Sequence, residues 1–229
     1  MIVVVGSLAW RATEPAGPAG RACAIALAAA SSGATVELVG RAGDDPAGDA
    51  LLLALSRLHV GHAAVLRDPS RPTPLASPVA VPDDDEAMSP FRDETPDPGA
   101  RSATGTGDGP RLDPADVSLA MRYLDPTGVL VVTDDVPLDA LAAAVDESRF
   151  AGTRLVAILG PGTRPAGSVP AGLPPDATVL VAPDEADAEP GAFEALVGAY
   201  AAALDRGVAP EAAFAAAAGA GWEALAATD

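Results

Sequence analysis

Two aspartates between glycines make up the stretch of this sequence that is best suited to hold a ligand. Residues 33–48 read GATVELVGRAGDDPAG, in which a hydrophobic run enters a loop with three glycines, and Asp44 and Asp45 separate the last two. The residues that follow predict a helix. Strand, glycine-rich turn and helix form the repeating unit of parallel α/β sheets, which bind ligands at the carboxyl ends of their strands. We therefore expect a ligand site at this turn, with Asp45 either contacting the ligand or serving only the turn and the helix start.

The composition excludes several kinds of chemistry. All 14 basic residues are arginines, so mechanisms that need a lysine, such as P-loop phosphate binding or Schiff-base formation, are excluded. Cys23 is the only cysteine; its small apolar neighbours favour a buried thiol over a nucleophile, and no internal disulfide can form. His59 and His62 have no cysteine or histidine partners at the spacing of metal ligands.

The formal net charge of −18 predicts a surface that repels nucleic acid and anionic membranes, and its simplest consequence is solubility. We expect neither nucleic acid nor a membrane as a partner. No apolar run is long enough to span a bilayer, and the first residues lack the basic region of a signal peptide. Together with the single cysteine, these features predict a cytoplasmic protein.

The alternation of strands and helices predicts one α/β domain over residues 1–229. Expected strands cover residues 2–5, 36–39, 63–66, 128–132, 154–159 and 178–181, and expected helices cover 21–32, 49–58, 114–123, 138–148, 191–205 and 209–226. Residues 11–20 predict a loop. Residues 68–114 are dense in Pro, Gly, Asp, Ser and Thr, which is typical of a poorly ordered insert or the remnant of a small lid.

The motifs along the chain resemble those of the ribokinase (PfkB) family of carbohydrate and nucleoside kinases. The family pattern G-x-V-G-x-D-x-x-G followed by G-V-D is similar to residues 40–48 (GRAGDDPAG) and 59–61 (HVG). Similar segments follow at residues 131–141 (VVTDDVPLDAL), 155–161 (LVAILGP), 180–187 (LVAPDEAD) and 197–207 (VGAYAAALDRG). The resemblance implies a ribokinase-like three-layer sandwich with a mostly parallel sheet and a reduced lid.

The same resemblance implies a reaction, the transfer of phosphate from Mg-ATP to a hydroxyl group of a sugar or nucleoside. It places Arg11, Gly20, Gly43 and Asp45 on the substrate side of the site. A paired lid is a natural dimer contact in this family, so the resemblance also implies a homodimer.

The catalytic side falls on residues 191–194, GAFE, which resemble the end of the family's D-T-x-G-A-G-D loop. Gly191 and Ala192 then supply backbone amides for the phosphate, and Glu194 stands for the aspartate that takes the proton of the substrate hydroxyl. Asp184 and Asp187 fall on acidic positions of the Pro-Asn-Glu-x-Glu motif. The resemblance implies a magnesium-linked role for these two acids, and the alternative is a solvated loop.

Several positions depart from the family pattern. Phe193 replaces a glycine beside the phosphate, and Glu194 carries its carboxylate one methylene further out than aspartate does; such misplacement can slow a reaction by about 100-fold or more. Arg11 replaces a sugar-contacting aspartate, and Ala24 replaces an asparagine. The long section that precedes the catalytic loop in the family is missing before Gly191. In an equally good alignment this segment is an ordinary helix with no catalytic loop.

Two classes of function follow from these patterns. The first is a carbohydrate kinase-like protein that is impaired or inactive in phosphoryl transfer. The second is a noncatalytic domain that binds a metabolite or a protein partner. The surroundings of Glu194 discriminate between them: an open pocket facing Asp45 favours the first class, and a filled helix interface favours the second.

Overall fold

The computed structural model describes residues 1–76, 109–160, 172–184 and 189–226. Its centre is a six-stranded, wholly parallel sheet with the strand order β5-β4-β1-β6-β7-β8. The strands are β1 (Ile2–Val5), β4 (Val36–Gly43), β5 (Gly61–Asp68), β6 (Val129–Val132), β7 (Arg154–Leu159) and β8 (Thr178–Val181). The predicted α/β class is confirmed.

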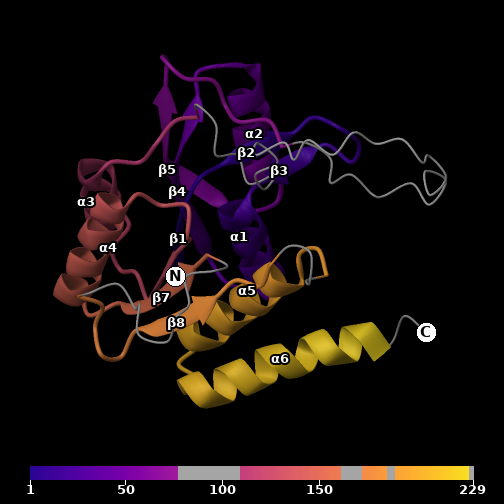
Figure 1. Ribbon diagram of the computed structural model, residues 1–229, viewed down its shortest axis with the longest axis vertical. Coiled ribbons are helices and arrows are strands. Elements are labelled where there is room, and N and C mark those ends of the chain that lie inside the picture. Colours follow the sequence, from indigo (N-terminus) through magenta and orange to yellow (C-terminus); the bar gives the residue numbers. More distant parts are fainter. Residues whose placement is uncertain (77–108, 161–171, 185–188, 227–229) are drawn as a thin grey trace, which may run out of the picture.

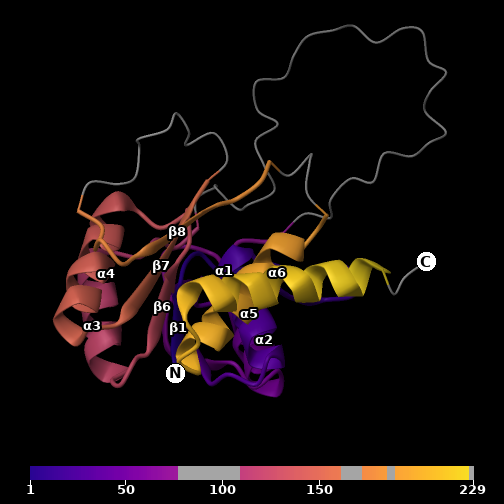
Figure 2. The same cartoon turned by 90° about the horizontal axis from the view of Figure 1, so that it is seen from below.

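Helices cover both faces of the sheet and complete three layers (Figures 1 and 2). On one face lie α1 (Arg21–Ser31), α2 (Pro46–Arg57), α5 (Ala192–Asp205) and α6 (Pro210–Ala226), and on the other lie α3 (Pro114–Tyr123) and α4 (Leu138–Ala151). Figure 2 shows α6 along the outer side of α5, directed away from the sheet. No helix within the described part of the chain is long and apolar enough to cross a membrane.

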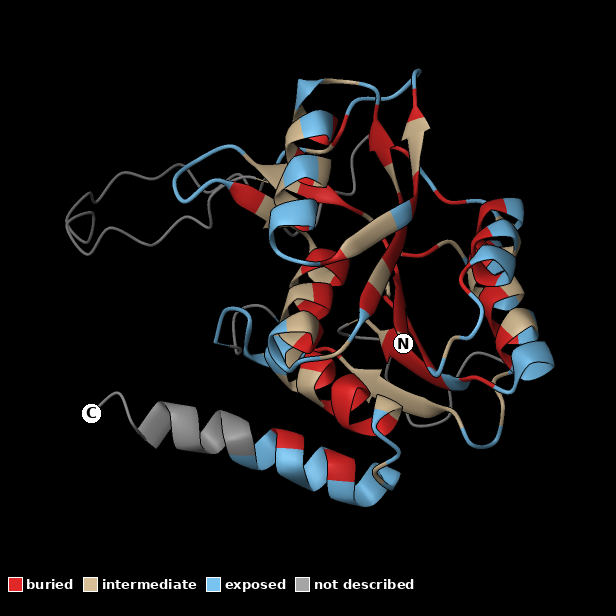
Figure 3. Ribbon diagram, turned by 180° about the vertical axis from the view of Figure 1, so that it is seen from behind, coloured by how far each residue is buried: buried red, intermediate tan, exposed pale blue. Residues whose placement is uncertain are grey.

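The side chains of each central strand alternate between two apolar cores. Along β1, Ile2 and Val4 join the core under α1 and α5, whereas Val3 and Val5 join the core under α3 and α4. Figure 3 shows these strands as buried between helices whose outer faces are exposed. A strand that is buried on both faces needs apolar side chains along its whole length, as in the run IVVV of β1.

Small residues let α5 approach α1 closely. A Cβ atom added at Gly198 of α5 would lie 2.7 Å from the backbone nitrogen of Ala29 and 2.8 Å from the carbonyl oxygen of Ile25, both in α1. Cys23 of α1 is buried, and burial raises the pKa of its thiol to about 12. The prediction of a buried thiol at this position is confirmed.

Two local predictions were wrong. The second strand does not end at Val39 but continues as β4 to Gly43, because β5 pairs with it as far as Gly43 and Asp68. Gly40 serves close packing within this strand, since an added Cβ atom would lie 2.8 Å from the side chain of Leu8. The predicted loop at residues 11–20 contains part of an antiparallel hairpin, β2 (Ala9–Arg11) with β3 (Gly17–Ala19).

Both ends of the segment 68–114 are attached to the body of the protein. Trp10 donates its backbone N–H to Pro74 O at 2.8 Å and accepts a hydrogen bond from Ala76 N at 2.9 Å. At the other end, Leu112 is buried in the core under α3 and α4. Residues 77–108, where the prediction of a poorly ordered insert chiefly falls, lie outside the described residues.

Candidate functional site

An arginine joins the starts of two helices at the carboxyl edge of the sheet. Arg21 is the first residue of α1, and its Nε lies 3.1 Å from Oε1 of Glu194 in the first turn of α5. Its Nη1 donates to Oδ1 of Asp134, which follows β6. The three side chains are largely buried, with exposures of 10% for Arg21 and 17% for each acid. One guanidinium therefore holds two carboxylates from different elements.

The charge of Arg21 is secured by these acids. Burial alone lowers the pKa of its guanidinium, but the hydrogen bonds and charges of Asp134 and Glu194 raise the pKa above its ordinary value. The ring of Phe193 adds to this arrangement, because its centroid lies 6.0 Å from Cζ of Arg21. Phe193 also packs against the core that underlies α1 and α5.

A further carboxylate lies behind this group. Asp135 accepts hydrogen bonds from the hydroxyl of Thr133 and from the backbone N–H of Ser7, at 3.3 Å to Oδ2. Burial raises the pKa of Asp135. The hydrogen bonds from Thr133 and Ser7 oppose this rise, and the neighbouring charge of Asp134 adds to it. Asp135 thus links the residues that follow β1 and β6, which is a structural role.

Asp45 lies at the predicted turn, but its carboxylate is used by the protein itself. It is the N-cap of α2 and accepts from Gly48 N at 2.8 Å, from Thr73 N at 2.7 Å and from Thr73 Oγ1 at 2.8 Å. Burial raises the pKa of Asp45, but the hydrogen bonds from Gly48 and Thr73 more than offset this, and the pKa is lowered overall. The contacts fix the chain after β5 onto the start of α2.

Gly43 has a packing role in the same turn. Its N–H donates to Thr73 Oγ1 at 2.9 Å. A Cβ atom at this position would lie 2.8 Å from Arg71 O and 2.7 Å from Oδ2 of Asp45. The turn therefore needs glycine here in order to admit the segment at residues 71–73.

Two of the predicted residues lie at the N-termini of the joined helices. Gly20 is the N-cap of α1 with φ 90°, and Gly191 is the N-cap of α5 in the left-handed region with φ 79°. Ala192, the predicted phosphate ligand, already donates its N–H to Glu189 O at 3.1 Å. Residues 192–194 form the first turn of α5, as the alternative of an ordinary helix predicts.

The remaining predicted residues do not join this group in the structure. Arg11, at the end of β2, donates its Nε to Pro15 O at 2.8 Å on the exposed side of the hairpin. Asp184 follows β8 and is exposed, and Asp187 lies outside the described residues. Within the described ranges, no three His, Cys, Asp or Glu side chains are grouped so that they could hold a metal ion. Within the described part of the chain, no hydrogen bond or ion pair joins Asp45 to Glu194.

The sequence reasoning did not single out Arg21 or either acid after β6 as a site residue. One signal for Arg21 was present: a cation at the first position of a helix opposes the positive end of the helix dipole. An alanine-rich helix has no local reason to begin with arginine, so a partner carboxylate elsewhere in the chain was to be expected. Its identity depends on the tertiary structure.

One segment of the chain is similar to a known protein family. Residues 12–96, which include β3, α1 and the Gly43–Asp45 turn, match the family model described as pfkB family carbohydrate kinase. This segment, which spans less than half of the chain, is thus similar to PfkB carbohydrate kinases. Gly191 and Glu194, at the start of α5, lie beyond the matched residues. No curated protein matches the sequence.

Solved structures of PfkB proteins and their relatives share the fold. A candidate phosphofructokinase from Staphylococcus aureus is 13% identical, with a TM-score of 0.62, over 96% of this chain and 90% of that one. A PfkB protein from Polaromonas sp. JS666 is 17% identical, with a TM-score of 0.58, over 94% and 92%. A candidate Ribokinase II from E. coli, solved with ATP and Mg²⁺, is 13% identical, with a TM-score of 0.61, over 94% and 89%. The fold is ribokinase-like, as the motifs implied.

Proposed function

We propose that this chain is a PfkB-type carbohydrate kinase-like protein that is impaired or inactive in transferring phosphate from Mg-ATP to a hydroxyl group of a sugar or nucleoside. Residues 1–229 form one ribokinase-like domain in this proposal, with 68–114 as its insert or reduced lid. The family match and the fold support the kinase ancestry, and the start of α5 supports the impairment.

The contact between Arg21 and Glu194 is the observation that carries the proposal. A general base must present a free carboxylate oxygen to the substrate hydroxyl. Here Oε1 of Glu194 accepts from the Arg21 guanidinium at 3.1 Å, and the same guanidinium is held on its other side by Asp134. Turning Glu194 toward a substrate would break an ion pair that is largely buried. Glu194 is therefore a poor base in this arrangement.

The phosphate side supports the same conclusion. An anion hole at a helix start needs backbone amides with no other acceptor. The N–H of Ala192 is donated to Glu189 O, and the Phe193 side chain replaces the open backbone that glycine would give. Mg²⁺ would arrive here as part of the Mg-ATP substrate, and Asp184 of the proposed metal motif is exposed to receive it.

A second candidate, a noncatalytic metabolite-binding or protein-interaction domain, is favoured by Asp45 and by the largely buried position of Glu194 at the contact between α5 and α1. Both of its carboxylate oxygens accept hydrogen bonds from Gly48 and Thr73. Folding alone thus explains why Gly43 and Asp45 are present in a chain that does not phosphorylate a sugar. In this second reading, Gly20 and Arg11 belong to a helix start and a hairpin and contact no sugar.

A phosphoryl-transfer assay tests the proposal. The purified chain would be incubated with γ-labelled ATP, Mg²⁺ and a panel of hexoses, pentoses and ribonucleosides, with labelled product measured over hours. We expect turnover at least about 100-fold below the roughly 1–100 s⁻¹ that is typical of kinases. Turnover of about 1 s⁻¹ on any acceptor would overturn the proposed impairment.

Calorimetry with Mg-ATP separates the two candidates. Binding in the micromolar range without turnover is the outcome for an impaired kinase that retains its nucleotide site. An absence of heat at millimolar nucleotide supports the noncatalytic domain instead. The titration is repeated with Glu194→Gln for comparison with wild type. This variant keeps the size of the side chain and removes the charge that repels the nucleotide phosphates.

A further inference from the structure

The helix layer formed by α3 and α4 exposes large apolar side chains. Phe150 at the end of α4 is 93% exposed and Tyr123 at the end of α3 is 73% exposed, and Leu119 and Leu138 of the same two helices are also exposed. Single exposed apolar side chains are ordinary on protein surfaces, so a contact surface needs a neighbouring hollow to receive a partner. The group lies on the face of the sheet opposite α1 and α5.

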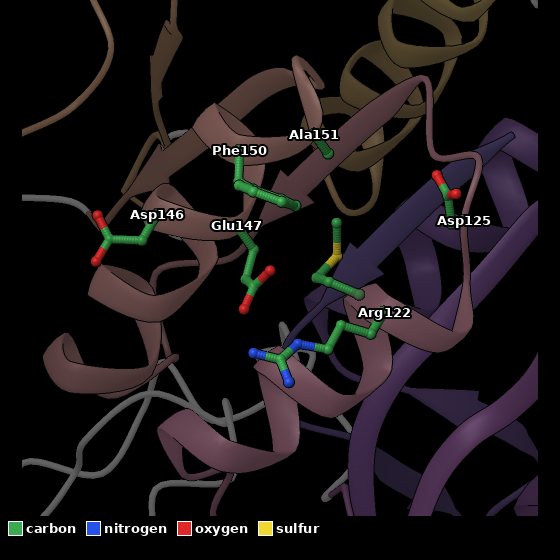
Figure 4. Close-up of a pocket in the computed structure, with 7 residues that line it drawn as sticks. Arg122, Asp125, Asp146, Glu147, Phe150 and Ala151 are labelled. Carbon is green, nitrogen blue, oxygen red and sulfur yellow. The ribbon is translucent and has the colours of Figure 1, made fainter.

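A hollow of about 720 Å³ lies between the C-terminal halves of α3 and α4. Its apolar lining comes from Met121, Phe150 and Ala151, and its charged lining comes from Arg122, Asp125, Asp146 and Glu147. Figure 4 shows Glu147 and Arg122 reaching into the same space from the two helices, while Asp146 points away from it. This α3–α4 hollow is open enough to admit part of a partner and has an apolar wall to receive it.

The charges around the hollow offset one another only in part. Asp146 lies 3.7 Å from Arg149 and is screened by it. Among the described residues, no hydrogen bond or ion pair involves the side chains of Glu147, Asp125 or Arg122. Two acids and one arginine are thus left without partners beside exposed aromatic surface. A local excess of negative charge remains.

We propose that the α3–α4 hollow docks a basic, amphipathic segment of a partner protein. An apolar side chain of that segment packs on Phe150 and Met121, and a lysine or arginine of the segment lies beside Glu147 and Asp125. The net charge of −18 steers a basic partner toward this chain and repels a second copy of it. Arg122 then sets the direction of the segment, because it disfavours a cation at its own side of the hollow.

The hollow lies at the opposite edge of the sheet from the Arg21 group. Helices α3 and α4 lead into β6 and β7, so their C-termini lie near the strand starts, whereas Arg21 and Glu194 lie at the carboxyl edge. A partner bound in the α3–α4 hollow therefore does not cover the candidate site. The inference holds whether or not the chain transfers phosphate.

NMR titration of the full chain with a designed peptide tests the inference. The probe is a synthetic amphipathic helix of about 18 residues built from leucine and lysine, compared with a peptide in which glutamate replaces each lysine, at about 150 mM salt. We expect amide shifts confined to the C-terminal halves of α3 and α4 for the lysine peptide, and none for the glutamate peptide. Phe150→Ser should weaken binding about 10-fold or more.

The matched control is Leu53→Ser on α2, which removes an apolar side chain that is 53% exposed but lies on the other face of the sheet. It should leave the affinity within about 2-fold. Shifts spread over the whole surface, or equal effects of the two variants, would overturn the proposal. A concentration-dependent dimer in light scattering that Phe150→Ser returns to monomer would overturn it in favour of a second copy as the occupant.

Discussion

Arg21 at the start of α1 holds Glu194 at the start of α5, with Nε and Oε1 3.1 Å apart. In the motif that this segment resembles, the position of Glu194 carries the general base. In this chain the carboxylate instead joins two helices, and Asp134 completes the arrangement from the end of β6. An acid that the family pattern assigns to chemistry thus has a structural partner.

Removing that partner should destabilise the protein. Arg21→Ala leaves Asp134 and Glu194 without a cation in a largely buried group, and we expect the free energy of unfolding to fall by about 2–3 kcal/mol. Urea unfolding followed by circular dichroism measures the change. Arg57→Ala on the exposed end of α2 is the control and should change stability by no more than about 0.5 kcal/mol. Equal effects of the two substitutions would mean that the ion pairs of Arg21 do not form in solution.

Asp45→Ala should remove about 2 kcal/mol of stability at neutral pH, because the substitution deletes the N-cap of α2 and the acceptor of two hydrogen bonds from Thr73. Since folding lowers the pKa of Asp45, its contribution is present above about pH 4 and is lost as the pH falls through the lowered value. The difference between wild type and variant should therefore shrink in acid. Asp44→Ala, whose exposed side chain pairs with Arg67, should show a change of about 0.5 kcal/mol or less.

The contribution of Asp135 to stability should depend on pH in the opposite direction. Burial raises its pKa in the folded state, so its favourable contribution is complete below about pH 4 and is lost as the pH rises through the raised value. Asp135→Asn keeps an oxygen for the N–H of Ser7 and removes the buried charge. We expect the variant to be more stable than wild type at neutral pH and to lose this advantage near pH 3.5. The free energy of unfolding of both proteins, measured between about pH 3.5 and 7, tests this. A variant that is less stable than wild type at every pH would contradict the raised pKa of Asp135.

Gly43→Ala should destabilise the fold by about 1–3 kcal/mol, because the added Cβ atom meets the backbone of Arg71 at 2.8 Å. The control is Gly219→Ala in α6, where nothing lies within 4 Å of an added Cβ atom. That substitution should instead raise stability by about 0.5–1 kcal/mol, the ordinary gain of alanine over glycine in a helix. Thermal unfolding of both variants measures the expected loss of stability at Gly43 and the expected gain at Gly219.

Much of the fold could be predicted from the sequence, because local patterns determine most of its elements. The run Ile2–Val5 is aliphatic at every position and forms a central strand, and residues 114–123 form a helix with the predicted bounds. The errors lie where tertiary contacts decide. Gly40 and Gly43 suggested a turn, yet they belong to β4 because β5 and the segment around Thr73 pack against them.

The candidate site could be predicted only in part. Gly20, Gly191 and Glu194 were correctly placed at helix starts, because glycine and acidic residues there follow local rules. The pairing of Glu194 with Arg21 could not be foreseen, since 173 residues separate them along the chain and only the packing of α5 on α1 brings them together. The same holds for Asp45, whose partner Thr73 lies in a segment that sequence patterns left without structure.

The most direct test of the impaired kinase compares phosphoryl transfer by wild type and Glu194→Gln under identical conditions with Mg-ATP and the sugar and nucleoside panel. Because Glu194 is bound by Arg21 and does not act as a base in this account, both proteins should be equally slow, at least about 100-fold below typical kinases. Wild-type turnover near 1 s⁻¹ that falls about 100-fold or more in Glu194→Gln would contradict the account, since Glu194 would then be a working general base.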